Sequence, residues 1–70
     1  MRLYGADLEP GQSLRHELPA GRHAWLQVAR GSVALNGVTL QAGDGAAISD
    51  EPVLDCAART GAEVLLFDLP

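Results

Sequence analysis

Short apolar segments alternate with turn residues along the whole chain. The segments run for roughly four to eight residues, and turns rich in glycine and proline separate them. The 8 glycines and 4 prolines lie almost wholly in these turns. No stretch keeps a helical period of apolar residues over about ten positions. The pattern therefore predicts an all-β fold, a small antiparallel β-barrel or sandwich that forms one domain over residues 1–70.

The spacing of the turns predicts where each strand begins and ends. The predicted strands are Arg2–Leu8, Ser13–Leu18, His23–Arg30, Ser32–Asn36, Val38–Gln41, Ala46–Ser49, Val53–Ala58 and Glu63–Leu69. The strongest local signal is Asn36-Gly37, because both residue types tolerate the positive φ angles of a type I′ turn. A hairpin is expected across it. Its apolar side chains are expected to pair and to face one core: Val33 and Leu35 across from Val38 and Leu40.

Alternation along His23–Arg30 divides its side chains between two faces. The expected inner set is Ala24, Leu26 and Val28, and the expected outer set is His23, Trp25, Gln27 and Ala29. In so small a barrel the interior should be filled by side chains. The residues expected to fill it are Leu26, Val28, Val33, Leu35, Leu40, Ile48 and Leu54.

The last segment, Glu63–Leu69, is apolar on both faces apart from its two acidic residues. Such a strand is buried on both sides or covers something outside its own barrel. Trp25 on the outer face supports the same interpretation, since an exposed indole more often anchors a contact than lies free in solvent. Trp25, Leu65 and Phe67 are therefore candidate interface residues. The expected partner is a second copy in a homo-oligomer, most simply a dimer, or another domain.

Composition narrows the class of protein. A 70-residue chain buries only about 60% of its unfolded surface, so its core is marginal. The 9 acidic residues exceed the 5 basic ones, all arginine, and the net charge of -4 argues against a nucleic acid or an anionic membrane as partner. No apolar run approaches the ~18 residues of a membrane span. The residues after Met1 do not resemble a signal peptide, so a cytoplasmic location is expected.

His16 and His23 are the only imidazoles and the first candidates for metal ligands. With Glu17 they would supply two histidines and a carboxylate, a set suited to iron or zinc. Alternation, however, sends Glu17 to the face opposite His16. Exposed structural histidines are therefore the preferred interpretation, and a divergent metal site using His16 and His23 stays as an alternative.

No other side chain predicts catalysis. Cys56 lies in an apolar segment without a signalled cation or imidazole to lower its thiol pKa, so it is interpreted as a small buried hydrophobe. Asp44, between two glycines, is interpreted as a residue that caps its own turn. The spacing around it lacks the length and the lysine of a phosphate-binding loop. No catalytic residue and no cofactor are expected.

Two stretches carry a resemblance to a known family. Residues 24–37, Ala-Trp-Leu-Gln-Val-Ala-Arg-Gly-Ser-Val-Ala-Leu-Asn-Gly, followed by residues 40–46, Leu-Gln-Ala-Gly-Asp-Gly-Ala, resemble a cupin. The whole chain resembles the C-terminal cupin domain of pirin-like bicupin proteins of the quercetin 2,3-dioxygenase type, and residues 62–69 resemble the terminal strand of that family. The resemblance implies the cupin (RmlC-like) double-stranded β-helix.

The resemblance also says where a metal would be bound. Metal-binding cupins carry two histidines and a glutamate before the turn glycine, here Gly31, and one more histidine after the second motif glycine, here Gly43. The corresponding positions are Ala24 for the glutamate, Pro19 and Glu17 (or Ala20 and Leu18) for the histidine pair, and Leu54 for the last histidine. Alanine, proline and leucine offer no side-chain donor, so this set cannot coordinate a metal.

In the pirin-like family, the metal and the oxygenolysis of flavonols belong to the N-terminal cupin. The resemblance therefore implies a metal-free, non-catalytic cupin half with a role in packing and assembly, whose partner is an N-terminal cupin domain or a second copy of the chain. Two alternatives remain open at this point. One is a module that binds a small apolar molecule in the barrel interior, and the other is a divergent metal-dependent dioxygenase that uses His16 and His23.

Overall fold

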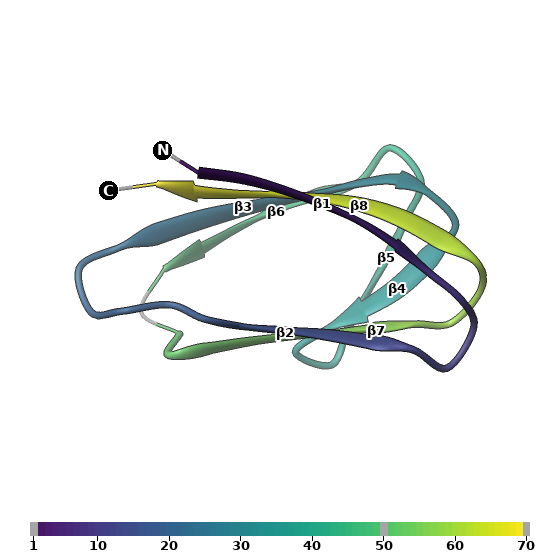
Figure 1. The fold of residues 1–70 in the computed structure, drawn as a ribbon, viewed down its shortest axis with the longest axis horizontal. Helices are drawn as coiled ribbons and strands as arrows, with labels where there is room; N and C mark the ends of the chain where they lie inside the picture. The colour runs from purple at the N-terminus through teal and green to yellow at the C-terminus, as the bar shows by residue number, and fades with distance from the viewer. Residues whose placement is uncertain (1, 50, 70) are drawn as a thin grey trace.

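Two antiparallel four-stranded sheets form the molecule (Figure 1). The structure is a computed structural model that describes residues 2–49 and 51–69. The strands are β1 (Arg2–Leu8), β2 (Ser13–Glu17), β3 (His23–Arg30), β4 (Ser32–Leu35), β5 (Val38–Gln41), β6 (Gly45–Ser49), β7 (Val53–Ala58) and β8 (Ala62–Leu69). Sheet A has the order β1-β8-β3-β6, and sheet B has the order β2-β7-β4-β5. The predicted all-β fold is confirmed. The described residues contain no helix of the length and hydropathy that crossing a membrane requires.

Chain order and spatial order differ in both sheets. Only β4 and β5 are neighbours both along the chain and in a sheet, whereas β8 lies between β1 and β3. The other connections cross from one sheet to the other, which Figure 1 shows as loops that join the two layers at their ends. The first and last strands are therefore hydrogen-bonded neighbours, and the start of β1 and the end of β8 lie at the same end of the molecule.

All eight predicted strands are present, and none of their bounds differs from the prediction by more than one residue. The predicted turn is confirmed as well, because Asn36 and Gly37 have φ angles of 47° and 87°. The β4–β5 register pairs Val33 with Leu40 and Leu35 with Val38, as expected.

One expectation about this hairpin is wrong. Val38 is 61% exposed, although Val33, Leu35 and Leu40 are buried. The reason is its place in the fold: β5 is the edge strand of sheet B, and Val38 begins that strand next to the turn. Register places its side chain on the inner face, but no further strand covers that corner.

The core lies between the inner faces of the two sheets. All side chains predicted to fill it are buried: Leu26, Val28, Val33, Leu35, Leu40, Ile48 and Leu54. The predicted alternation of β3 is confirmed, with Ala24, Leu26 and Val28 buried and Trp25 on the other face. In β8 every second side chain is buried and the others are half-buried. This strand therefore contributes to the core on one face and to the surface of sheet A on the other.

Candidate functional site

The candidate interface residues share the outer face of sheet A. Phe67 lies opposite Leu3 of β1 on one side and opposite Trp25 of β3 on the other. Directly opposite residues of an antiparallel pair project from the same face, as do residues two positions apart in a strand. The outer face therefore carries one continuous apolar surface. This surface, called the sheet A patch below, consists of Leu3, Trp25, Ala47, Leu65, Phe67 and Leu69.

Exposure varies across the sheet A patch. Leu3 is 56% exposed and Trp25 is 39% exposed, whereas Leu65, Phe67 and Leu69 are half-buried. Leu3 is exposed because β1 is an edge strand, whereas the β8 side chains are flanked by those of β1 and β3. Trp25 also lies in a central strand, but its neighbour on the β6 side is the small Ala47. Large apolar side chains at such exposure are common singly but unusual as a contiguous group.

The indole of Trp25 is held in a defined position. Its Nε1–H donates a hydrogen bond of 3.2 Å to Gln27 Oε1, and Gln27 Nε2 donates one of 3.1 Å to the Asp44 carbonyl oxygen. The ring also lies against Gly45 of β6, where a Cβ atom would collide with it. The polar edge of the indole is thus satisfied within the chain, and its apolar face is presented outward. The roles of Gln27 and Gly45 were not predicted from the sequence, because both depend on contacts between strands.

The structure does not bring the two histidines together. His16 lies in β2 of sheet B and reaches Asp68 on the inner side, whereas His23 is exposed on the outer face of sheet A. Sheet A therefore separates the two rings. Glu17 is exposed on the face opposite His16, as alternation predicted. Within residues 2–49 and 51–69, no group of three or more His, Cys, Asp or Glu side chains could hold a metal ion.

Two other candidates have the structural roles that the sequence predicted. Cys56 is 2% exposed, and burial together with the neighbouring Asp55 carboxylate raises the pKa of its thiol. A raised pKa favours the unreactive thiol over the thiolate. Asp44 Oδ2 accepts a 2.9 Å hydrogen bond from the backbone N–H of Gln41, and so the carboxylate caps its own turn.

A partly buried charge cluster lies at the end of the barrel where β1 begins and β8 ends. Asp68, in β8, is 7% exposed. Its Oδ1 accepts hydrogen bonds from Arg22 Nε at 2.9 Å and forms an ion pair with Arg22 Nη2 at 2.8 Å. Its Oδ2 lies 3.3 Å from His16 Nε2, and the ring of Tyr4 packs on the His16 ring at 5.2 Å. Tyr4, His16, Arg22 and Asp68 are called the Asp68 cluster below.

The Asp68 cluster is held together by an ionised carboxylate. The hydrogen bond from Arg22 lowers the pKa of Asp68 below its ordinary value. Burial acts in the opposite direction but is outweighed, because the His16 hydrogen bond and the charge of Arg22 also favour the carboxylate. The role of Asp68 was not predicted from the sequence. Apart from Glu63 and Asp68, β8 is apolar on both faces, so its sequence does not show which face is buried.

The residues at the expected metal-ligand positions do not fit a metal ion. Ala24, Leu18 and Leu54 are buried and apolar, and Pro19, Ala20 and Glu17 are exposed. Two potential donors do lie at this end of the barrel, His16 and Asp68, but the carboxylate of Asp68 is already paired with the Arg22 cation. A metal cation there would have to displace a guanidinium.

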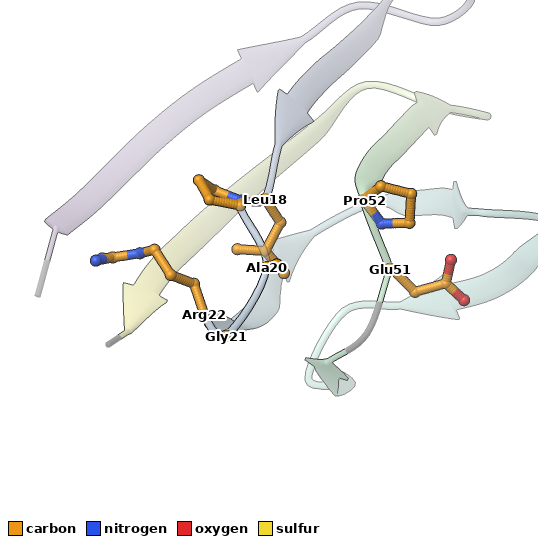
Figure 2. Close-up of a pocket in the computed structure, with 7 residues that line it drawn as sticks. Leu18, Ala20, Gly21, Arg22, Glu51 and Pro52 are labelled. Atoms are coloured by element: carbon orange, nitrogen blue, oxygen red, sulfur yellow. The ribbon is translucent and has the colours of Figure 1, made fainter.

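Small hollows open on the surface of the sandwich. One, of about 260 Å³, is formed by the β2–β3 turn and the segment before β7 (Figure 2). In this view Arg22 extends away from Glu51 and Pro52, which form the opposite wall. Another, of about 280 Å³, lies between the edge strands β5 and β6. A third, of about 320 Å³, is lined by residues at the end of β1, the end of β3 and the start of β8. The first two are slightly below the usual range of ~300–1,000 Å³ for ligand pockets, and the third is at its lower limit.

Comparison with known proteins agrees with the fold. A model of the family described as the quercetinase C-terminal cupin domain matches residues 1–69. A quercetin 2,3-dioxygenase of Escherichia coli strain K12 is 43% identical over 70 residues, which are 100% of this chain and 30% of the relative. The chain therefore spans less than a third of the length of this curated relative.

Solved structures show the same similarity in three dimensions. The crystal structure of YhhW from Escherichia coli has a TM-score of 0.95 and 43% identity, over 97% of this chain and 29% of that one. The structure of bacterial pirin YhhW in complex with nickel(II) has a TM-score of 0.94 and the same identity, over 97% of this chain and 30% of that one. From its sequence, its two sheets and these matches, the chain belongs to the quercetinase C-terminal cupin domain family of pirin-like proteins.

Proposed function

We propose that this chain is a metal-free, non-catalytic cupin domain whose role is packing and assembly. In this proposal the oxygenolysis of flavonols, the activity for which its relatives are named, belongs to the part of those longer proteins that the chain does not span. The partner of the domain is that remaining part of a pirin-like protein, or a second copy of the chain when it is alone. We further propose that it works in the cytoplasm, where its single thiol stays reduced.

The observation that carries this proposal is the sheet A patch. A domain of this size has a marginal core and gains stability by covering apolar surface that it cannot bury itself. The patch combines an exposed indole with five further apolar side chains on one face. The indole is positioned by Gln27 and Gly45, so little side-chain entropy is lost when a partner covers it. Aromatic anchors of this kind often dominate the energetics of protein interfaces.

The inner face of the barrel supports a non-catalytic role. The expected positions of the metal ligands carry apolar side chains except for the exposed Glu17, and the Cys56 thiol is buried with a raised pKa. A ligand-binding role for the interior has less support, because side chains such as Leu26, Val28 and Val33 fill it at 0–1% exposure. A dioxygenase site based on His16 and His23 has less support still, because the two rings lie on different sides of sheet A.

The deciding experiment is sedimentation of the chain at tens of micromolar. We expect the wild type to self-associate, most simply as a two-fold dimer, and Trp25→Glu to shift the population to monomer by placing a charge in the patch. Ala57→Glu is the matched control, because Ala57 is exposed in β7 of sheet B and the same charge there leaves the patch unchanged. A stable monomer with Trp25 fluorescence already quenched and shielded from solvent would contradict the proposal.

A further inference from the structure

The Asp68 cluster lies at the level of two expected metal-ligand positions. The β3–β8 register places Asp68 directly opposite Ala24, the position of the metal-binding glutamate. The β2–β7 register places His16 directly opposite Leu54, the position of the last histidine. Directly opposite residues project from the same face of a sheet. The carboxylate of Asp68 and the imidazole of His16 therefore project into the barrel beside two positions at which a metal ligand would stand.

A positive charge is already present there. The Arg22 guanidinium approaches Asp68 Oδ1 through two nitrogen atoms, at 2.8 and 2.9 Å, and Asp68 itself is almost fully buried. We infer that the Arg22 guanidinium is the resident cation of this end of the barrel and takes the place of a divalent metal. This inference rests on the proposed metal-free function. It adds that the metal is replaced by an internal ion pair, Arg22–Asp68, which joins the β2–β3 turn to β8.

This geometry would keep a divalent metal ion out of this end of the barrel. A divalent cation bound to Asp68 would lie within a few ångströms of the guanidinium, and like charges at that distance repel strongly in a partly buried site. Figure 2 shows Arg22 extending from the turn as one long side chain. A histidine side chain followed by a metal–nitrogen bond of about 2.0–2.1 Å spans a similar length. An imidazole at position 22 could therefore present a metal ion to the carboxylate that the guanidinium now contacts.

The test is whether removal of this internal cation creates a metal site. We expect Arg22→His to bind about one zinc ion per chain, held by the new imidazole, Asp68 and His16. Binding is measured by calorimetry after removal of metals with EDTA, and folding is checked by circular dichroism in EDTA. Arg59→His is the matched control, because Arg59 is an exposed arginine in the turn before β8. The double variant Arg22→His/Asp68→Asn should lose the zinc site.

Two failures can be told apart. If Arg22→His binds no more zinc than Arg59→His, the guanidinium does not occupy a metal position, and the inference is overturned while the proposed function stands. If the wild-type chain itself keeps about one nickel or zinc ion per chain after dialysis, the metal-free function fails first and the inference fails with it.

A second measurement does not depend on a new metal site. The titration of Asp68 is followed by the carbon-13 shift of its carboxyl group in the wild type, Arg22→Gln and Arg59→Gln. If the guanidinium is the counter-ion, Arg22→Gln raises the pKa of Asp68 and Arg59→Gln leaves it unchanged. An unchanged pKa of Asp68 in Arg22→Gln would overturn the inference.

Discussion

At position 68 an acidic side chain ends the otherwise apolar inner face of β8. A buried carboxylate is unfavourable unless charged or polar groups replace its water, and here Arg22 and His16 do so. The aromatic ring of Tyr4 packs on His16 and shields one side of the cluster. Trp25 likewise has a partner for its polar group, because its indole N–H donates a hydrogen bond to Gln27 although the ring lies at the surface.

The depressed pKa of Asp68 makes stability depend on pH. Because Arg22 and His16 favour the carboxylate in the folded state, the folded pKa lies below the ordinary value of 3.8. The resulting stabilisation is complete above the unfolded-state pKa and is lost as the pH falls through the lower folded-state pKa. We expect Asp68→Asn to be less stable than the wild type at pH 7 and to lose less stability over that acidic range. Urea unfolding at a series of pH values measures both effects.

The control for this prediction is Glu17→Gln, since Glu17 is an exposed carboxylate of β2 outside the cluster. Its profile should follow that of the wild type. Equal pH dependence in Asp68→Asn and the wild type would show that Asp68 is not the group responsible.

Among the elements, the β4–β5 hairpin is the unit determined most locally. Its turn needs positive φ at Asn36 and Gly37, and glycine adopts such angles without strain. Asn36 has a second role that the turn alone does not require. Its Oδ1 accepts a 2.8 Å hydrogen bond from the Asp55 backbone N–H, and its Nδ2 donates one of 3.3 Å to the Val53 carbonyl oxygen. The side chain thus ties the hairpin to β7.

Substitution of Gly37 by valine should destabilise this hairpin. Gly37 has φ 87°, and a β-branched residue is strained there although the space around it is open. We expect a loss of about 1–3 kcal/mol in the free energy of unfolding, measured in a denaturant melt. Thr39→Val is the control, because it places valine in the extended backbone of β5. An unchanged midpoint for Gly37→Val would mean that the turn does not constrain the fold.

In the whole molecule, the inner and outer faces of the sheets differ in their roles. Their inner faces enclose a filled apolar core, whereas the outer face of sheet A carries a second apolar surface. β8 contributes to both surfaces, because it lies between β1 and β3 in sheet A and its side chains alternate between the two faces. Assembly through the sheet A patch would bury apolar surface that a chain of this size cannot bury alone.

A metal-free domain should purify without a stoichiometric metal and should not oxidise flavonols. The expectation follows from Ala24, Pro19 and Leu54, which offer no side-chain donor at positions where a metal would need one. Elemental analysis after dialysis checks the first part, and oxygen uptake with quercetin checks the second. About one iron, nickel, copper or zinc ion per chain would contradict the prediction. Loss of that metal in His16→Ala or His23→Ala would then favour the dioxygenase alternative.

The sequence by itself determined the features that depend on neighbours along the chain. Turn residues and period-two alternation located all eight strands, the hairpin and the core positions, because these signals are read over a few residues. The same alternation placed Trp25 on an outer face and separated Glu17 from His16.

Only the tertiary structure decided which strands lie side by side, and with them the contacts between distant residues. Val38 is exposed because β5 became an edge strand, and His16 and His23 are apart because β2 and β3 entered different sheets. The Asp68 cluster joins residues from four parts of the chain, and the patch joins β1, β3, β6 and β8. Alternation specifies a face for each side chain but not its partner, because strand order depends on long-range pairing that no local pattern encodes.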